Sequence, residues 1–348
     1  MFSSLIPWYQ ENGRDLPWRS TTDPYKIWLS EIILQQTRVE QGWDYYLRFI
    51  AAFPTVEVLA KASEDEVLRL WQGLGYYSRA RNLHHAAQQI VSMGEFPSTY
   101  SEIRKLKGVG DYTAAAIASF AYGLPHAVVD GNVYRVLSRF FTIATPIDTT
   151  EGKKHFASLA QEILPIQQAA LHNQAMMDLG ATVCIPRTPQ CEVCPLAHAC
   201  LSCAEGRAEE FPVKEKRMKV SHRYFTYLIV TDGNEMLLHR RPEGDIWQGL
   251  YEPLLIETPE PLSEQELFTH PLVAPLLNSQ ATLSPIASNI VHKLSHQHLH
   301  TDAYLLRTEK LSPILIEKDT RIIPLAELDK YALSRLVTRI LEQVDCLR

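Results

Sequence analysis

The sequence predicts a mainly α-helical N-terminal region followed by a smaller α+β domain, and three observations indicate this division. From Pro24 to about Leu201, apolar residues recur at helical spacing, and glycines and prolines punctuate the segments. Residues 204–220 are charged and poor in apolar residues, which is typical of a linker. From residue 222 the pattern changes to short apolar runs between turn residues. We therefore expect a linker at residues 205–221.

The elements follow in order along the chain. The N-terminal region carries the helical pattern in YKIWLSEIILQQTRVEQGWDYYLRFIAAF, DEVLRLWQGLG and SRARNLHHAAQQIVSM. In the C-terminal domain, YFTYLIV and EMLLHRR flank an Asp-Gly pair, which is a strong signal for a β-hairpin. HTDAYLLR predicts another strand, and YALSRLVTRILEQV predicts a final helix.

Charge and hydropathy limit the classes of function. The 348 residues have a net charge of −6, which argues only weakly against nucleic-acid binding because binding needs a local basic face. No apolar run approaches the ~20 residues of a membrane span. The N-terminus lacks the pattern of a secretory signal. We expect a soluble, monomeric, cytoplasmic protein that does not contact membranes.

The stretch LKGVGDYTAAAIASF places two glycines directly before an alanine-rich helical pattern. Gly108 and Gly110 permit backbone conformations with positive φ and leave no side chain in the way. The helix that follows would direct free N–H groups and its positive dipole end at this point, which suits a phosphate. Lys105 and Lys107 would add charge to such a contact. An ordinary turn between helices is the alternative.

Two carboxylates stand in contexts that favour a chemical role. Glu31 lies in the apolar helical run WLSEIILQQT, on the same face as Ile27 and Leu34. A partly buried carboxyl group there would have a raised pKa and could act as a general acid, and a paired core glutamate is the alternative. Asp130 and Asn132 precede the helical run of VVDGNVYRVLSRF. Either residue could be a helix N-cap, and Asp130 could instead stabilise a cation at the mouth of a cleft.

Five of the six cysteines lie between residues 184 and 203, which favours a metal site over disulfides in an intracellular chain. Four of them have the spacing C-x6-C-x2-C-x5-C, namely Cys184, Cys191, Cys194 and Cys200. Four thiolates suit zinc or a [4Fe–4S] cluster. We favour the cluster because structural zinc sites usually have two short paired spacings, and this run has one. Cys203 and Cys346 are not expected to be ligands.

Two further motifs have both a functional and a structural interpretation. Tyr76 and Tyr77 lie between Gly75 and the basic residues Arg79 and Arg81, an arrangement that can wedge into a duplex and hold its backbone. Buried tyrosines at a helix start are an equally good interpretation. The run HKLSHQHLH could form a metal site, although a polar strand and loop is the simpler interpretation. Its histidines are His292, His296, His298 and His300.

Together these motifs resemble those of one family. A helix-hairpin-helix, then an aspartate in VDGNV and then the cysteine spacing are similar to the layout of the endonuclease III-like DNA glycosylases. The segments LPWR, PYKIWLSEIILQQT, GLGYYSRARNLH and HNQAMMDLGATVC resemble more narrowly the MutY-type adenine DNA glycosylases. The resemblance runs from about Leu5 to Cys200 and continues more loosely through residues 222–348.

The resemblance implies a fold. A helical barrel with the helix-hairpin-helix would occupy about residues 21–120, inside a catalytic region of residues 1–204. The N-terminal segment and residues 121–204 would form the domain that carries a [4Fe–4S] cluster. Residues 222–348 would be a Nudix-like domain that recognises 8-oxoguanine. The substrate would be double-stranded DNA with adenine opposite 8-oxoguanine or guanine.

The resemblance also implies a chemistry. After base flipping, Glu31 would protonate adenine at N7, and Asp130 would stabilise the oxocarbenium-like sugar, or bond to it transiently, before water attacks C1′. Bifunctional members have a lysine at the position of Tyr112, and a phenol cannot form their Schiff base. A monofunctional glycosylase that leaves the strand intact is therefore expected.

The other implied roles concern positioning and binding. Tyr112 and Asn132 would position the sugar and Asp130. The adenine pocket would be lined by Trp18, Arg19 and Gln174. The space around 8-oxoguanine would be filled by Gln36, Thr37, Leu74 and Tyr76. The DNA backbone would be held by Gly108, Gly110, Lys105, Lys107, Arg79 and Arg81.

The C-terminal domain departs from the pattern of a working Nudix enzyme. The G-x5-E-x7-R-E-x2-E-E run that holds magnesium is not found between residues 222 and 348, so nucleotide hydrolysis is not expected. The Phe-Ser-His-type loop that recognises the lesion corresponds to Leu294, Ser295 and His296. The aromatic residue is lost at 294, but Ser295 and His296 could still hydrogen-bond the lesion.

Two other functions compete with this interpretation. A bifunctional endonuclease III-like enzyme for oxidised pyrimidines would share the fold, the aspartate and the cluster, but Tyr112 and the C-terminal domain argue against it. A DNA-binding protein without activity would use only the hairpin, and the presence of both Glu31 and Asp130 argues against that.

Overall fold

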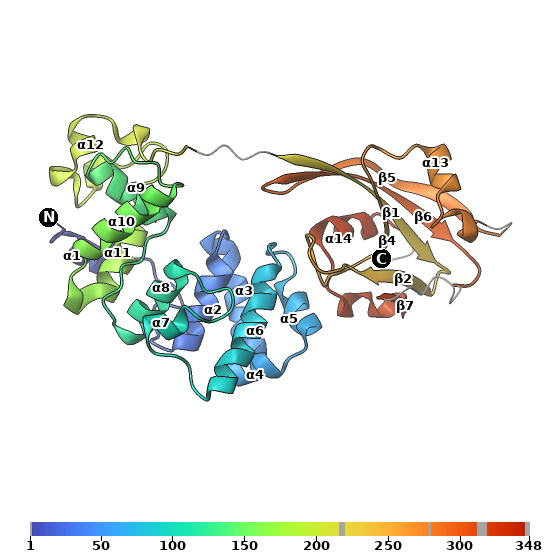
Figure 1. Cartoon of the computed structure of the whole chain (residues 1–348), viewed down its shortest axis with the longest axis horizontal. Helices are drawn as coiled ribbons and strands as arrows, with labels where there is room; N and C mark the ends of the chain where they lie inside the picture. The colour runs from blue at the N-terminus through green and yellow to red at the C-terminus, as the bar shows by residue number, and fades with distance from the viewer. Residues whose placement is uncertain (1, 216–219, 278–279, 312–318, 345–348) are drawn as a thin grey trace. The chain divides into compact units, whose positions relative to one another are not determined.

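The computed structural model describes residues 2–215, 220–277, 280–311 and 319–344, and these residues form two compact units (Figure 1). The first unit comprises residues 1–61 and 82–217, and the second comprises residues 62–81 and 218–348. The sequence did not indicate that residues 62–81 would belong with the C-terminal residues. Each unit is described separately below.

The first unit is helical, as its hydrophobic periodicity predicts. Its helices are α1 (Leu5–Asn12), α2 (Pro24–Leu34), α3 (Val39–Ala52), α4 (Val56–Lys61), α7 (Tyr100–Ile103), α8 (Asp111–Tyr122), α9 (Gly131–Phe140), α10 (Thr150–Glu162), α11 (Ala169–Thr182) and α12 (Leu201–Ala204). Short 3-10 turns lie at η1 (Ile166–Gln168), η2 (Cys191–Val193), η3 (Ala197–Ala199) and η4 (Ala208–Glu210). Helix α6 (Ser78–Met93) begins in the second unit and continues in the first.

Small and capping residues set where the helices of the first unit begin and how closely they pack. The Asp23 side chain accepts a hydrogen bond from the backbone of Tyr25, and Pro24 occupies the first turn of α2. Residues Thr113–Ser119 of α8 are buried and mostly alanine, so α8 can approach α2 closely. Helix α9 packs with its apolar face against α11, and Phe156 of α10 joins the same core.

Part of the expected linker is fixed to the first unit. The side chain of Phe211 is buried, and its carbonyl accepts a hydrogen bond from the Arg139 guanidinium at 3.1 Å. The backbone of Ile147 donates to the carbonyl of Val213 at 3.0 Å. This part of the segment is therefore not a free linker despite its low apolar content, because its backbone carbonyls accept hydrogen bonds from the first unit.

The second unit is built on a seven-stranded sheet with the order β3-β2-β1-β6-β5, in which β4 also pairs with β1 and β7 with β2. The strands are β1 (Ser221–Thr231), β2 (Glu235–Arg240), β3 (Tyr251–Glu252), β4 (Leu254–Thr258), β5 (Thr282–Lys293), β6 (Gln297–Arg307) and β7 (Thr320–Pro324). The β1 and β2 strands form the predicted hairpin around Asp-Gly, and β6 is the predicted later strand. Strands β1 and β6 run parallel, and the other pairs are antiparallel.

Both faces of this sheet are covered. Phe225, Tyr227 and Ile229 of β1 pack with the last helix, α14 (Arg335–Leu341), whereas Leu228 and Val230 pack with α13 (Glu264–Thr269) on the other face (Figure 1). Burial on both sides explains why β1 is an almost continuous apolar run. The unit also contains α5 (Glu64–Trp71) and the 3-10 turns η5 (Ala274–Leu276) and η7 (Leu325–Lys330).

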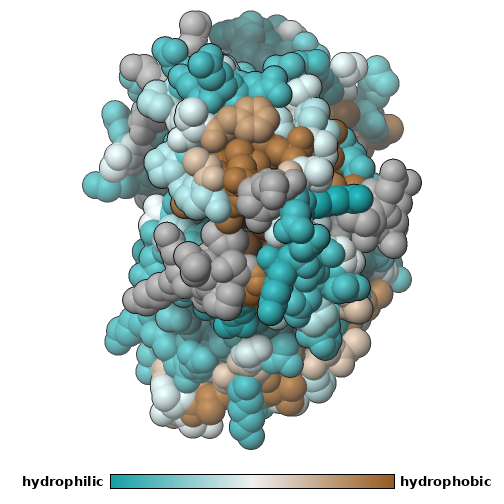
Figure 2. All heavy atoms as spheres, turned by 90° about the vertical axis from the view of Figure 1, so that its right-hand side faces the viewer, coloured by the Kyte–Doolittle hydropathy of each residue, from teal (hydrophilic) through white to brown (hydrophobic). Residues whose placement is uncertain are grey.

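The face of the molecule drawn in Figure 2 is mainly hydrophilic. Figure 2 shows a hydrophobic area on this side of the molecule, surrounded by hydrophilic residues. The exposed large apolar side chains in this unit include Phe268, Leu272 and Val291. Within the described part of the chain, none of the helices is both long and apolar enough to cross a membrane.

Candidate active site

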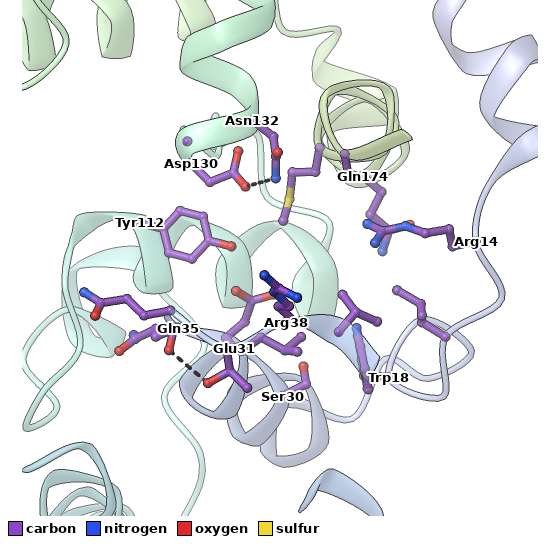
Figure 3. Close-up of a pocket in the computed structure, with 18 of the residues that line it drawn as sticks. Arg14, Trp18, Ser30, Glu31, Gln35, Arg38, Tyr112, Asp130, Asn132 and Gln174 are labelled. Atoms are coloured by element: carbon purple, nitrogen blue, oxygen red, sulfur yellow. Dashed lines mark hydrogen bonds between the residues drawn. The ribbon is translucent and has the colours of Figure 1, made fainter. Parts of the chain in front are cut away.

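A cavity of about 850 Å³ opens in the first unit. Its walls come from α2, the start of α8, the start of α9, α11 and the segment around residues 14–19. Figure 3 shows Glu31, Tyr112 and Asp130 around the same space, with the Tyr112 hydroxyl pointing toward the two carboxylates. The two carboxylates singled out in the sequence, 99 positions apart, therefore face one cavity.

Glu31 lies on α2, and only 7% of its surface is exposed. Burial raises the pKa of its carboxyl to about 7, and a hydrogen bond from the Tyr112 hydroxyl opposes the shift. Among the described residues no cation forms an ion pair with it, although Arg19 is near enough to lower the pKa slightly. Burial therefore brings the pKa of Glu31 close to neutral pH, as a general acid requires.

Asp130 is the N-cap of α9 and lines the cavity at the same time. One oxygen accepts the backbone N–H of Val133 at 2.8 Å, and the other accepts the Asn132 amide at 2.7 Å. Burial raises the pKa of Asp130, while these hydrogen bonds lower it and stabilise the carboxylate form. The sequence offered the cap and the cleft carboxylate as alternatives, and the structure has both.

The start of α9 is held by residues that the sequence did not single out. The Arg135 guanidinium donates to the Asn132 side-chain oxygen at 2.8 Å and to the carbonyls of Gly180 and Cys184, both at 2.6 Å. A Cβ atom at Gly180 would lie 2.6 Å from the Cβ of Asn132, so only glycine fits there. Gly180 belongs to the motif HNQAMMDLGATVC, which was the sequence signal that could have identified it.

The residues expected around adenine lie in the cavity wall. Trp18 packs edge-on against Trp43 and Tyr46 and is 7% exposed. Arg19 also lines the cavity, but its guanidinium is paired with the buried Asp178 at 2.6 Å. Gln174 accepts a hydrogen bond from the Tyr9 hydroxyl at 3.0 Å, so its amide nitrogen can be directed elsewhere. Sequence reasoning missed other lining residues, among them Arg14, Ser30 and Arg38.

The residues expected around 8-oxoguanine fall in both units. Gln36 and Thr37 line the cavity of the first unit, and Gln36 has a positive φ of 55°. In the second unit Leu74 is buried, whereas Tyr76 is 43% exposed and its hydroxyl is hydrogen-bonded to Ser295. His296 is exposed next to that serine.

The hairpin between α7 and α8 differs from expectation in one detail. Gly108 has a φ of 77° and a Cβ there would lie 2.6 Å from that of Asn82, so glycine is required. Gly110 is extended, with a φ of −92° and a ψ of 178°, and open space lies where its side chain would be. Gly110 therefore leaves the N-terminus of α8 uncovered, which is what an anion would need. Lys105 and Lys107 are exposed beside it.

Two arginines expected at the DNA backbone make internal contacts. Arg79 donates to the carbonyls of Leu74 and Gly75 at 3.4 and 3.3 Å, and its guanidinium stacks 5.0 Å from the Trp71 ring. Arg81 donates to the Gln248 carbonyl at 2.6 Å. Both hold the second unit together, so a DNA contact would have to compete with these bonds.

The cysteine run folds into one pocket. Cys184, Cys191, Cys194 and Cys200 all line it, as does Cys203. The Arg139 guanidinium donates to the Cys184 sulfur at 3.4 Å, and a cation in this position fits a group held by several thiolates. Cys346 lies outside the described residues.

The histidine run is divided between elements. His298 and His300 lie on β6 and share a sheet face with His222 of β1, whose Nδ1 is 2.8 Å from the His300 Nε2. His292 lies on β5 and packs against Trp247. Across the described residues, no three cysteine, histidine or acidic side chains are grouped so as to hold a single metal ion.

Comparison with known proteins adds to this geometry. Residues 29–165 match the HhH-GPD superfamily of base excision DNA repair proteins, and residues 226–343 match the NUDIX domain family. The adenine DNA glycosylase of Buchnera aphidicola subsp. Acyrthosiphon pisum is 34% identical, and the alignment covers 98% of this chain and 97% of that protein. The chain belongs to the adenine DNA glycosylase family. A mouse adenine DNA glycosylase is also 34% identical, with 88% of this chain and 70% of the mouse protein covered.

Solved structures agree with the helical part of this assignment. A thermostable thymine-DNA glycosylase is 30% identical, has a TM-score of 0.54 and covers 58% of this chain and 94% of its own. Endonuclease III in a trapped covalent intermediate with DNA has a TM-score of 0.52 at 22% identity, over 59% of this chain and 94% of its own. The N-terminal region therefore has the endonuclease III-like helix-hairpin-helix fold, and the chain is a DNA glycosylase.

Proposed function

We propose that this chain hydrolyses the N-glycosidic bond of adenine that is mispaired with 8-oxoguanine or guanine in double-stranded DNA. The observation that carries the proposal is the pairing, in one cavity, of a buried carboxyl whose pKa is raised to about 7 with a carboxylate held at a helix N-terminus. Glycoside hydrolysis needs one acid and one anion of this kind. The adenine specificity is taken from the named relatives.

Glu31 is the acid in this scheme. A flipped adenine would enter the cavity and receive the Glu31 proton at N7, which makes the base a neutral leaving group. The Tyr112 hydroxyl, which donates to Glu31, keeps the carboxyl oriented and favours its charged form after the proton has left.

Asp130 is the anion. Its oxygens are already engaged by Val133 and Asn132, so it can face a developing positive charge on the sugar without reorganising. Asn132 is in turn fixed by Arg135, which makes both residues positioning groups for Asp130. Water would then attack C1′ and complete the hydrolysis.

The same geometry supports a glycosylase without strand cleavage. Tyr112 occupies the position at which bifunctional members have a lysine, and its phenol cannot form an imine with the sugar. The product would therefore be an intact strand with an abasic site, which breaks only when alkali is added.

Recognition of the opposite base and of the backbone would use other residues. Gln36 and Thr37 line the cavity, and in the second unit the hydroxyls of Tyr76 and Ser295 meet. We propose that Tyr76, Ser295 and His296 of the second unit contact 8-oxoguanine. The exposed N-terminus of α8, beside Lys105 and Lys107, would bind a backbone phosphate.

We also propose a [4Fe–4S] cluster held by Cys184, Cys191, Cys194 and Cys200. The support is that all four line one pocket whose wall includes a guanidinium directed at Cys184. The cluster would supply a folded loop and no redox step. This loop joins the active site through Arg135, which contacts both Asn132 and the carbonyl of Cys184.

A labelled duplex with adenine opposite 8-oxoguanine tests the proposal. We expect cleavage of the adenine strand after alkali only, and no cleavage of a duplex with oxidised thymine opposite adenine. Glu31→Gln and Asp130→Asn should each lose activity, whereas the exposed carboxyls altered in Glu162→Gln and Asp15→Asn serve as matched controls. Direct nicking of the oxidised-thymine duplex would establish the bifunctional alternative, and binding without base loss would establish a protein without activity.

A further inference from the structure

The cysteine pocket holds one more sulfur than the four-cysteine spacing requires. Cys203 lies on α12 (Leu201–Ala204), one helical turn after Cys200, and it lines the same pocket as the other four cysteines. Cys200 is the extended N-cap of this helix and Cys203 is its third residue, and both line the pocket. The four-cysteine spacing ends at Cys200 and therefore does not include Cys203. It also does not predict the short helix α12, which carries Cys203.

Cys203 has a specific neighbour among the four. The Cys191 thiol is hydrogen-bonded to the Cys203 sulfur. The other three sulfurs bond different partners: Cys184 accepts from Arg139 at 3.4 Å, Cys194 accepts from the backbone of Leu196, and Cys200 lies 3.6 Å from the Arg139 carbonyl and from the Ser202 hydroxyl. Cys194 also lies near Cys203, but Cys191 is the ligand that is hydrogen-bonded to it.

The setting of Cys191 permits an exchange. Cys191 begins the three-residue turn η2 (Cys191–Val193), whose next residues, Glu192 and Val193, are exposed. Cys184, in contrast, follows α11 directly and packs with the core of α9 and α11. A change of ligand at Cys191 would not disturb a helix, whereas a change at Cys184 would.

We propose that Cys203 is a reserve ligand, meaning a fifth cysteine that can take the place of Cys191 on the same iron. The proposal rests on the [4Fe–4S] cluster proposed above. In the exchange the Cys203 thiol gives up a proton as its thiolate binds iron, and the released Cys191 thiolate takes up a proton. The number of thiolate ligands, the net charge and the number of electrons on the cluster stay the same, so no oxidant or reductant is needed.

Iron content separates this proposal from a structural role for Cys203. The full-length chain is prepared anaerobically as wild type, Cys191→Ala, Cys203→Ala and the double variant. We expect the wild type and both single variants to hold four irons of a [4Fe–4S] cluster, and the double variant to lose one iron or the whole cluster. Electron paramagnetic resonance would detect a three-iron cluster in the double variant, and circular dichroism would check that its helices remain.

Cys184→Ala, with and without Cys203→Ala, is the matched control. Cys203 does not replace this more deeply packed ligand, so both variants should lose iron equally. Equal iron in Cys191→Ala and in the Cys191→Ala/Cys203→Ala double variant would overturn the reserve ligand. If the wild type itself binds no iron and sulfide, the proposed cluster is wrong as well, and this outcome is distinguishable because it precedes any substitution.

Discussion

Glu31 in the first unit and Glu252 in the second are both buried glutamates, and burial raises the pKa of each to about 7. Both accept a hydrogen bond from a tyrosine, from Tyr112 in one unit and from Tyr227 at 2.8 Å in the other. The environments differ in whether a cationic side chain pairs with the carboxylate. The Arg241 guanidinium lies 2.8 Å from Glu252 and is itself buried, whereas Glu31 faces the cavity and lacks an ion pair among the described residues.

The difference separates the carboxyl that we propose as the acid from a structural one. A raised pKa reports burial, and burial is common to both glutamates. The charge on Glu252 is compensated by Arg241, so removing either partner would leave an isolated buried charge. Among the described residues, Glu31 forms no ion pair of this kind, so its proton can go to a substrate that enters the cavity.

The largest effect is expected when the two glutamates are changed to glutamine. Glu31→Gln should lower the single-turnover rate of base release by roughly 10²- to 10⁴-fold, because a proton donor is lost. Glu252→Gln should leave that rate close to the wild-type value. The measurement is alkali-dependent cleavage of a mispaired duplex at saturating enzyme. A Glu252→Gln rate as low as that of Glu31→Gln would contradict the assignment of Glu31 as the acid and Glu252 as a structural residue.

The next largest effect concerns stability and is confined to the second unit. Arg241→Met should lower the free energy of unfolding of that unit by about 3–5 kcal/mol, because Glu252 would be left buried without its cation. Arg241→Met/Glu252→Met should recover most of the loss. Calorimetric scans of these variants, with the exposed Arg307→Met as control, would check both expectations. A double variant as unstable as the single one would mean that the arginine acts through its other contacts.

The pH dependence of activity should follow Glu31. Because its pKa rises from 4.5 to about 7 on folding, the rate should fall as pH increases above about 7. The sign for stability is the same: the protonated form is favoured in the folded state, so the contribution is complete below about pH 4.5 and is lost as pH rises through about 7. The shift corresponds to roughly 3 kcal/mol.

Glu31→Gln should remove the contribution of Glu31 to the pH dependence of stability and leave that of Glu252, whose pKa is also raised to about 7. Glu252→Gln should leave the alkaline limb of the rate profile in place. A wild-type rate that stays constant from pH 6 to about pH 9 would contradict the assignment of Glu31 as the acid.

The smallest effect should come from Tyr112→Phe. The hydrogen bond from Tyr112 lowers the pKa of Glu31, so its removal should move the alkaline limb of the rate profile to higher pH. Tyr227→Phe removes the equivalent bond to Glu252 and should not move that limb. Rate profiles of the two variants, measured in the same buffers, would show whether the tyrosine acts through Glu31.

Features that depend on local sequence patterns could be predicted, whereas features that depend on long-range contacts could not. The periodicity of α2 and the cap before α9 indicated Glu31 and Asp130, and turn residues indicated the β1–β2 hairpin. The N-cap and the cleft carboxylate were treated as alternatives for Asp130. They are compatible because a cap uses the side-chain oxygens from one side and leaves the carboxylate facing the cavity from the other.

What the sequence missed depends on contacts between distant segments. Arg135 lies on α9, three residues after Asn132, but its guanidinium also bonds the carbonyl of Gly180 on α11, and no local spacing specifies the pairing of these two helices. Phe211 is fixed by Arg139, more than seventy residues away in sequence. Both glycines permit positive φ, but only Gly108 adopts it; Gly110 is extended with open space at its Cβ position, so no contact among the described residues requires glycine there.

The dual use of Asp130 limits how this pocket can change over evolutionary time. The side chains that cap a helix well are Asp, Asn, Ser and Thr, and of these only Asp also carries a charge. A protein engineer who wished to give the cavity a different reaction would find position 130 closed to most nucleophiles and bases. New chemistry would have to arise at a neighbouring position such as Tyr112, which faces the same cavity and caps nothing.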